Sequence, residues 1–500
     1  MRLVPRFALC LLSWALAACP PPSKPDSRDP APTSPPRNEP APKPQAPARV
    51  IVVGGGLAGL SAAYELGKLG VSTHLLEASD VFGGRVQTAR YEGGLSAEFG
   101  MQEMWEGNPL IDIARELKVE LDGEPKEPFS SVLLDGKVVP YVQDSSKAFF
   151  ASFLNASEQR ALDAWFKSTR ALREEIEHKG LESEPVKALQ NLSFKAWIEE
   201  QKLPAKVATF IKLTLECELA SGWESFSALS GVHELGLFLG AGLPNFHVQG
   251  GNSKLIAAMA NAIQGQKTLS ALVQGVRRKR SDSGAISVEV DYLKNNQVHT
   301  LEAERVVLAV PFVRLHQINF EPSLAPERLG SIVTLALGQY TVVHFIVDKA
   351  AAKTWEVDGK SPLPVLSDGP LGVIYGVQEP GPADQSNEVF TLLVYGMHAR
   401  AFHMIPRDMK IRELLTALDK LWPGFSSHVK ASHVYTYHPT ALPVWPPGRS
   451  PLDESSQLLR QPELGAHFAG DYLLGSHSDA AVKSGLEAAR AIAKELGASP

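Results

Sequence analysis

A glycine-rich hexapeptide early in the sequence has the spacing that binds a phosphate group. Residues 54–59, Gly-Gly-Gly-Leu-Ala-Gly, stand between an apolar run, Val50–Val53, and a helical pattern over residues 60–69. In such a strand–turn–helix unit the first glycine permits a tight turn, the second lets the backbone approach a pyrophosphate, and the third allows close packing of helix on strand. These positions are Gly54, Gly56 and Gly59, and Leu57 and Ala58 lie between the last two. Because a helix N-terminus presents free amide groups, the motif predicts a bound dinucleotide.

Two further segments extend this unit in the order that a dinucleotide requires. Residues 70–77 follow as a turn and a second strand that ends in Glu77, an acid placed to accept the ribose hydroxyls. Residues 83–88, Gly-Gly-Arg-Val-Gln-Thr, come next. Gly84 lets the backbone close over the pyrophosphate, and Arg85 can give it charge-assisted hydrogen bonds. An enzyme that releases NAD has less need of this second clamp, so the pattern favours FAD.

The order of these motifs over residues 49–496 resembles the flavin amine oxidases, in which a GGR-x-x-T segment follows the acid. Residues 97–100 look like the family's acidic-x-Gly segment, which would place Gly100 and Met101 along the flavin ring. Residues 272–276 resemble the strand whose backbone, at Val273, would meet the adenine. Residues 249–255 match the family's glycine pair before a helix, and residues 305–311 resemble its strand ending in proline.

The C-terminal segment resembles the family's closing flavin motif. Residues 467–472 would bring Gly470 and Asp471 to the ribityl and phosphate groups. The next helix, which carries Ala480, Ala481 and Val482, would direct its N-terminus at the flavin's pyrimidine end, where a reduced anionic flavin holds charge. No cysteine stands in the C-terminal region where some relatives attach the flavin, so the resemblance implies non-covalent FAD.

The resemblance implies an α/β fold with a Rossmann-like FAD domain and an α+β substrate domain. The FAD domain is expected to be discontinuous, from residues 49–105, 249–315 and 460–500, with the substrate domain formed by 106–248 and 316–459. Residues 151–239 are predicted to form a helical lid, with Asn155, Ser193 and Ser227 as N-caps. Residues 333–348 and 388–396 are predicted as strands of a mixed sheet beneath that lid.

Two histidines are candidates for catalysis where the chain departs from the family. Typical members carry a lysine on the strand that corresponds to residues 338–348, and Val342 aligns with it. His344 would face the same side of that strand, with a partly buried structural histidine as the alternative. Ala441 and His477 align with the two aromatic rings that frame the amine in many relatives, so cation–π recognition would be weaker in this chain. His247 could line the cavity or support its wall.

Composition excludes several other functions. The 500 residues carry a formal net charge of -6, which gives no reason to expect nucleic acid binding. The basic run at residues 277–280 is expected to be a solvated hairpin or loop. Cys10, Cys19 and Cys217 offer no spacing for a zinc site or disulfide framework, so no metal is expected. Cys217 stands in an amphipathic stretch over residues 210–219 and is expected to be a core thiol.

The N-terminus predicts export and lipidation. Arg2 and Arg6 precede an apolar run over residues 7–18, as in a signal peptide. Residues 16–19, Leu-Ala-Ala-Cys, resemble the lipobox of bacterial lipoproteins, in which Cys19 would be acylated as the end of a signal peptide spanning 1–19. Residues 20–48 are rich in proline and predict an extended linker. The expected product is an exported, membrane-anchored protein, with ordinary secretion as the alternative.

The expected reaction is hydride transfer from an amine or amino acid to FAD, which then passes electrons to dioxygen, a quinone or another acceptor. One rival is dehydrogenation of a C–C bond, as in protoporphyrinogen oxidases and carotenoid desaturases, which an apolar cavity would favour. Another is a lipoprotein that binds flavin without turning over a substrate, which a cavity filled by side chains would favour.

Overall fold

The computed structural model describes residues 48–126, 129–141, 146–236, 243–356, 359–378, 381–436 and 441–498. The signal peptide, Cys19 and nearly all of the proline-rich segment therefore lie outside the described residues. Within these seven ranges, no helix is both long and apolar enough to cross a membrane.

One part of the protein is built around a parallel five-stranded sheet, and we call it the parallel-sheet region. Its strand order is β10-β2-β1-β14-β23, and every neighbouring pair is parallel. The central strands β1 and β14 are mostly apolar because both faces of the sheet are covered there. Their bounds are Gln266–Thr268 (β10), Thr73–Leu76 (β2), Val50–Val53 (β1), Arg305–Leu308 (β14) and Ala466–Phe468 (β23).

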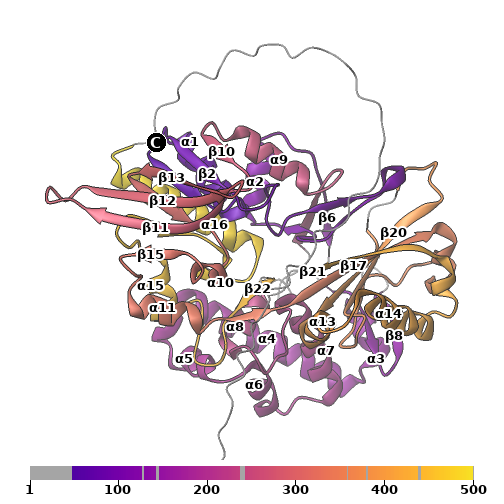
Figure 1. Cartoon of the computed structure of the whole chain (residues 1–500). Helices are drawn as coiled ribbons and strands as arrows, with labels where there is room; N and C mark the ends of the chain where they lie inside the picture. Colours follow the sequence, from indigo (N-terminus) through magenta and orange to yellow (C-terminus); the bar gives the residue numbers. More distant parts are fainter. Residues whose placement is uncertain are drawn as a thin grey trace, which may run out of the picture. The chain divides into compact units, whose positions relative to one another are not determined.

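The two faces of this sheet pack against different partners (Figure 1). Val50 and Val52 of β1 join a core built from helices, whereas Ile51 and Val53 point to the other face, as the period of two requires. The helices are α1 (Leu57–Lys68), α2 (Pro109–Glu116), α9 (Ser253–Ala262) and α16 (Ser478–Glu495). The opposite face meets a second sheet of order β13-β12-β11-β15, with bounds Gln297–Ala303, Ile286–Lys294, Leu272–Arg280 and Asn319–Glu321.

A seven-stranded sheet forms the mixed-sheet region, in the order β21-β17-β20-β19-β18-β7-β8. Its neighbours are antiparallel except for β18 and β7, which run parallel. The mixed sheet confirms the predicted fold class. The bounds are Val429–Thr436 (β21), Tyr340–Asp348 (β17), Asn387–Tyr395 (β20), Val373–Val377 (β19), Val365–Leu366 (β18), Ser131–Leu134 (β7) and Lys137–Val139 (β8).

Helices cover both faces of the mixed sheet. On one face Val342 and Leu393 pack with the predicted helical lid, and on the other Val343 and Leu392 pack with a second group of helices. The lid contains α3 (Ser146–Phe153), α4 (Ala156–Lys179), α5 (Glu184–Asn191), α6 (Phe194–Glu200), α7 (Ala205–Leu219) and α8 (Ala228–Glu234). The opposite face carries α12 (Ala352–Trp355), α13 (Gly396–His403) and α14 (Arg407–Leu421).

Short elements connect the two regions. The small sheets are β3 (Thr88–Arg90) with β4 (Ser96–Glu98), β16 (Ala336–Gly338) with β22 (Leu442–Val444), and β5 (Met104–Trp105) with β9 (Leu243–Val248) and β6 (Leu121–Lys126). The short helices include α10 (Phe312–Leu315), α11 (Pro326–Val333) and α15 (Glu454–Arg460).

The lid helices begin where the sequence predicts. Asn155 caps α4 in a capping box with Glu158, and Ser193 and Ser227 accept backbone N–H groups at the starts of α6 and α8. Each hydroxyl or amide oxygen satisfies an N–H that has no partner within the helix. The predicted N-caps are therefore confirmed.

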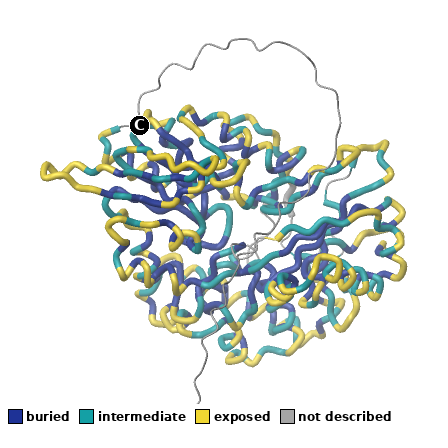
Figure 2. Tube along the Cα trace, viewed as in Figure 1, coloured by how far each residue is buried: buried dark blue, intermediate teal, exposed yellow. Residues whose placement is uncertain are grey.

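The structure corrects three local expectations. Residue 333 ends α11, and the strands of this segment begin only at Ala336 and Tyr340. The helix after the glycine motif begins at Leu57, three residues before the predicted start, because the turn enters the helix directly. The basic run at 277–280 is not fully solvated. Its member Arg278 is buried and pairs with Glu463, 3.1 Å away, whereas the turn that follows at residues 281–285 is exposed (Figure 2).

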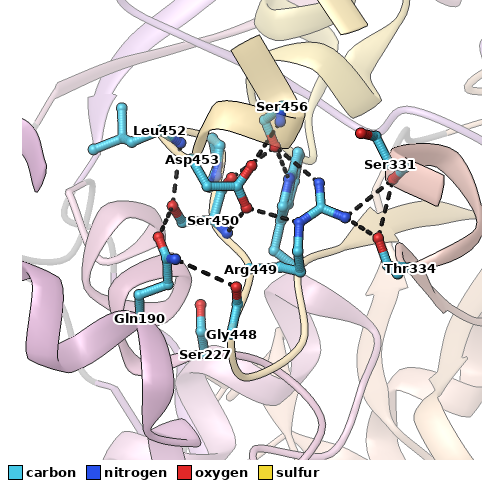
Figure 3. A network of polar contacts seen from close by, with 12 residues as sticks. Gln190, Ser227, Ser331, Thr334, Gly448, Arg449, Ser450, Leu452, Asp453 and Ser456 are labelled. Carbon is cyan, nitrogen blue, oxygen red and sulfur yellow. Dashed lines mark hydrogen bonds and ion pairs between the residues drawn. The ribbon is translucent and has the colours of Figure 1, made fainter. Parts of the chain in front are cut away.

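A buried arginine, Arg449, fixes the segment that runs from β22 to α15 (Figure 3). Its guanidinium pairs with Asp453 at 2.7 Å and also donates to the Ser331 carbonyl, the Thr334 hydroxyl and the Ser456 hydroxyl. From the same turn, the Ser450 hydroxyl donates to Gln190 of α5 at 2.7 Å. The network therefore ties this segment to α11 on one side and to the lid on the other.

Replacing Arg449 with alanine should lower the free energy of unfolding by about 3–5 kcal/mol, because Asp453 would remain buried without its cation. Urea denaturation followed by tryptophan fluorescence measures this change. As a matched control, Lys483→Ala removes an exposed ion pair to Asp479 and should cost less than about 1 kcal/mol. Equal losses in the two variants would contradict the structural role of Arg449.

Candidate active site

The glycine loop after β1 is shaped by two backbone contacts that exclude a side chain. Gly54 has φ +104°, and a Cβ there would lie 2.5 Å from the Ala309 carbonyl oxygen. A Cβ on Gly59 would lie 1.8 Å from the Gly54 carbonyl oxygen, so α1 can approach β1 only through glycine. At Gly56, in contrast, a Cβ would meet nothing within 4 Å. The protein is thus crowded around the first and third glycines and open at the second, which is where a pyrophosphate is expected.

Glu77 is held at the end of β2 by the glycine loop itself. Its carboxylate accepts the Gly55 N–H at 2.6 Å, and its second oxygen accepts the Ser79 N–H and hydroxyl at 2.8 Å. The Glu77 carbonyl accepts the Ala271 N–H at 2.8 Å, which places the start of β11 and the buried Val273 in the same neighbourhood. The predicted ribose and adenine positions are therefore adjacent in the fold.

Two helices present N-termini that no side chain caps. The N-cap residue of α1 is Gly56 and that of α16 is His477, and neither makes a side-chain capping bond. The two helices pack closely at Gly485, where a Cβ would lie only 2.2 Å from the Ala58 carbonyl oxygen. Residues of both first turns are buried: Leu57, Ala58, Gly59, Ala480, Ala481 and Val482. Their free amides and dipole ends can stabilise negative charge, as a dinucleotide would supply.

Arg85 and Asp471 meet, although they stand far apart in the sequence. Gly83 and Gly84 both have positive φ, and the Gly83 N–H donates to the Gly55 carbonyl at 2.8 Å, which brings Arg85 beside the glycine loop. The Arg85 guanidinium pairs with Asp471 at 2.6 Å and donates to the Ala441 carbonyl at 2.6 Å. Gly470, before Asp471, donates its N–H to the Ser484 hydroxyl of α16. The GGR and closing motifs therefore form one wall of the site.

The segment that would pass the flavin ring is fixed from several sides. The Met101 N–H donates to the Arg85 carbonyl at 3.0 Å, and the Asn252 side chain donates to the Met101 carbonyl at 2.8 Å. The Gln102 amide donates to the Gly100 carbonyl at 3.0 Å. The Glu98 carboxylate accepts the Asn252 N–H at 2.8 Å. Gly100 and Met101 are thus held in a preorganised turn beside the GGR wall.

His344 is engaged on both ring nitrogens. Nε2 lies 3.0 Å from the Glu98 carbonyl, which can only accept, so Nε2 carries the hydrogen. Nδ1 is then the acceptor for the Tyr91 hydroxyl at 2.5 Å, and Tyr91 in turn accepts from Tyr435 at 2.9 Å. Burial lowers the pKa of His344 to about 4, so the ring is neutral. Its geometry ties β17 to the Glu98 backbone, and its proposed catalytic role stays a prediction.

A cavity of about 500 Å³ is lined by the end of α7, by strands of the mixed sheet, by α12, and by β5 and β9. Glu218 of α7, Tyr340 of β17 and Tyr375 of β19 line it, together with Glu103, Trp105 and His247. Its described lining residues include four glutamates and neither lysine nor arginine. Sequence reasoning left the place of His247 open and missed Glu218 and Glu103. The signal available for Glu218 was a charged residue next to the core thiol Cys217 in an amphipathic stretch.

His477 pairs with a carboxylate that sequence reasoning also missed. Its Nε2 lies 3.1 Å from Glu234, at the end of α8, whose side chain is nearly buried. Burial disfavours the imidazolium, but the charge and hydrogen bond of Glu234, together with Glu218 and Asp479, raise the pKa of His477 to about 9. His477 is therefore a cation at neutral pH, with its charge matched by Glu234. The predicted catalytic role of His477 is not tested by this geometry.

Comparisons with known proteins show the family and the fold of the chain. Residues 57–493 match the family described as flavin containing amine oxidoreductase, and the chain belongs to that family. It is 25% identical over 476 residues to an L-amino-acid oxidase from Demansia vestigiata, covering 89% of this chain and 86% of the relative. It is 24% identical over 343 residues to a probable flavin-containing monoamine oxidase A from Dictyostelium discoideum, covering 65% and 70%. Wild-type putrescine oxidase bound to putrescine has the same fold, with a TM-score of 0.74 at 22% identity over 90% of this chain and 100% of the other.

The chain is thus a flavin-dependent oxidoreductase, and FAD is its cofactor. The residues present fit that group. Gly56 leaves open space beside the uncapped N-terminus of α1, Glu77 is oriented near the start of β11, and Arg85 and Asp471 adjoin the second helix terminus.

A bulky residue at the open glycine should abolish FAD binding without unfolding the protein. Gly56→Leu meets no protein atom near its Cβ but would fill the space next to the helix terminus, so the purified variant should be folded and colourless. The ratio of flavin to protein absorbance measures the loss, and circular dichroism reports the fold. As a control, Gly67→Leu on α1 also enters open space and should stay yellow. A fully yellow Gly56→Leu protein would show that the phosphates bind elsewhere.

Proposed function

We propose that this protein oxidises the carbon–nitrogen bond of an amine, by transfer of a hydride from the substrate carbon to FAD. The observation that carries the proposal is the charge of the cavity. Its described lining holds Glu103 and Glu218 and no basic side chain other than His247. A carboxylate-bearing amino acid would meet repulsion there, whereas a cationic amine is attracted. Of the two substrate classes expected from the sequence, the cavity favours the amine.

The same cavity argues against the two rival functions. Dehydrogenation of an apolar C–C substrate would suit an apolar wall, but several carboxylates line this one. A protein that only stores flavin would need no internal space, but the cavity measures about 500 Å³. That volume lies in the range of small-molecule sites.

The bound flavin supplies the two-electron chemistry, and the chain's own residues position the groups that react. The Glu98–Met101 segment, held by Asn252 and His344, sets one side of the site. Arg85 and Asp471 set another. Val342, which aligns with the lysine of typical members, is buried against the lid. The reoxidation step would use dioxygen, a quinone or another acceptor.

The protein is also proposed to be exported and anchored to a membrane by a lipid on Cys19. The support is the sequence of residues 1–19, with its basic start, its apolar run and its Leu-Ala-Ala-Cys ending. Several acyl chains on one cysteine give firm anchoring because each buried methylene contributes roughly 0.8 kcal/mol. The proline-rich segment that follows would act as a spacer.

Anaerobic reduction of the flavin tests the substrate class. A protein that begins at Arg49 should lose the yellow absorbance of oxidised flavin when it is mixed with primary amines, and should keep it with amino acids or cyclic dihydro compounds. Anaerobic conditions remove any dependence on the electron acceptor. Bleaching by dihydro compounds alone would refute amine oxidation.

Substitution of the lipobox cysteine tests the anchor. In the native host, Cys19→Ser should move the protein from the membrane fraction to the soluble fraction, because no acyl chain can be attached. Cys10→Ser lies within the same apolar run and should leave the protein with the membranes. If Cys19→Ser stays with the membranes, the lipid anchor is wrong.

A further inference from the structure

We propose that the substrate is a diamine or longer polyamine, and that Glu218 binds the ammonium group that does not react. This inference rests on the amine oxidation proposed above and specifies its substrate class. It is supported by the Glu218 side chain, by the residues around that side chain in the cavity, and by the absence of a partner for it among the described residues.

The Glu218 carboxylate has no hydrogen-bond donor within the described part of the chain, unlike a neighbouring acid of the same helix. Two positions earlier, Glu216 accepts the Trp223 N–H at 2.9 Å and pairs with Lys212 at 3.6 Å. Among the residues that the structure describes, no N–H, O–H or basic side chain forms a hydrogen bond or ion pair with the Glu218 carboxyl, which lines the cavity. A partly buried carboxylate that lines a cavity without a partner favours a ligand that supplies one. A protonated amine is a small-molecule group that does so.

The position of Glu218 is fixed by its neighbours. The Tyr340 hydroxyl donates to the carbonyls of Cys217 and Glu218, the latter at 3.1 Å, so β17 holds the end of α7 in place. Tyr340, Tyr375 and Trp105 add aromatic wall to the same cavity. Such walls suit a methylene chain that ends in a cation. The carboxyl is therefore presented at a defined point of the cavity, beside aromatic side chains.

The charges around Glu218 leave room for a positive ligand. The acids that face it are Glu103 and Glu234, and the cation that faces it is His477. His477 is already paired with Glu234, so its charge is neutralised locally. Glu103 accepts the indole N–H of Trp105 at 3.0 Å. The cavity thus carries a net negative charge when Glu218 is ionised.

The bound ammonium must be one that does not react. Hydride leaves a carbon next to a nitrogen that can share its lone pair, so the reacting nitrogen has to be neutral. A carboxylate with no other partner stabilises the protonated form of a nitrogen beside it. Glu218 would therefore hinder oxidation if it bound the reacting group, and it favours binding if it holds a second, distant one.

The proposal also sets the pH dependence of binding. Burial, with the charges of Glu103 and Glu234, raises the pKa of Glu218 to about 7 despite His477. The neutral acid dominates below that pH, and the carboxylate that binds a cation dominates above it. Diamine binding should therefore strengthen as the pH rises through about 7, with a proton released on binding below it. The neutral form of the reacting nitrogen becomes more abundant with pH for a monoamine of equal length as well, so the change due to Glu218 is the rise in the ratio of diamine to monoamine affinity through about pH 7. Cys217, Tyr340 and Tyr375, which also face the site, have raised pKa values and stay neutral there.

The test uses the full-length holoenzyme and a matched pair of substrates: an α,ω-diamine and the n-alkylamine of the same length. Anaerobic flavin reduction gives the rate and the half-saturating concentration for each. The wild type should prefer the diamine, and Glu218→Gln should raise the half-saturating diamine concentration by about tenfold to a hundredfold, the range of a charge-assisted hydrogen bond. The value for the monoamine should change less than about twofold. Glu218→Asp should keep part of the preference, and Glu216→Gln should keep it all.

The outcomes separate this inference from the proposed function. Equal use of both substrates by the wild type, or an equal loss with both in Glu218→Gln, would sustain amine oxidation and overturn the role of Glu218. If the diamine binds in a Glu218-dependent way, seen as a shift of the flavin spectrum, but is not oxidised, the role stands and the proposed function fails. If Glu218→Gln does not fold, the pH dependence of the wild type with the two substrates decides.

Discussion

Everything in the site depends on backbone meeting backbone where two helices approach the first strand. A side-chain carbon on Gly59 would collide with the Gly54 carbonyl, and one on Gly485 would collide with the Ala58 carbonyl. These contacts bring the uncapped N-termini of α1 and α16 into one region and leave Gly56 open beside them. Because close packing tolerates no added volume, the glycines determine where a phosphate can approach.

The substrate cavity carries the opposite charge to the site that would hold the cofactor. Helix termini and Arg85 offer positive potential to a dinucleotide, whereas Glu103 and Glu218 offer negative potential to an amine. Specific contacts join the two regions. His344 binds the Glu98 carbonyl, and Arg85 binds the Ala441 carbonyl. These hydrogen bonds link the mixed-sheet region to the residues that would hold the cofactor.

The sequence predicts those features that depend on nearby residues. The apolar run of β1, the roles of Gly54 and Gly59, and the N-caps Asn155, Ser193 and Ser227 all follow from local sterics or local hydrogen bonds. The partners of His344, the ion pair of His477 with Glu234 and the burial of Arg278 do not follow, because the partner comes from a distant segment in each case. A strand pattern shows which face a histidine takes but not what packs against that face.

A crystal structure of the FAD complex tests the central claim most directly. The account predicts that the dinucleotide runs from Glu77, across Gly56 and the N-terminus of α1, to Asp471 and the first turn of α16, with the flavin ring beside Gly100 and Met101. A pyrophosphate bound away from Gly56, or a flavin ring that does not reach the Gly100 segment, would contradict it.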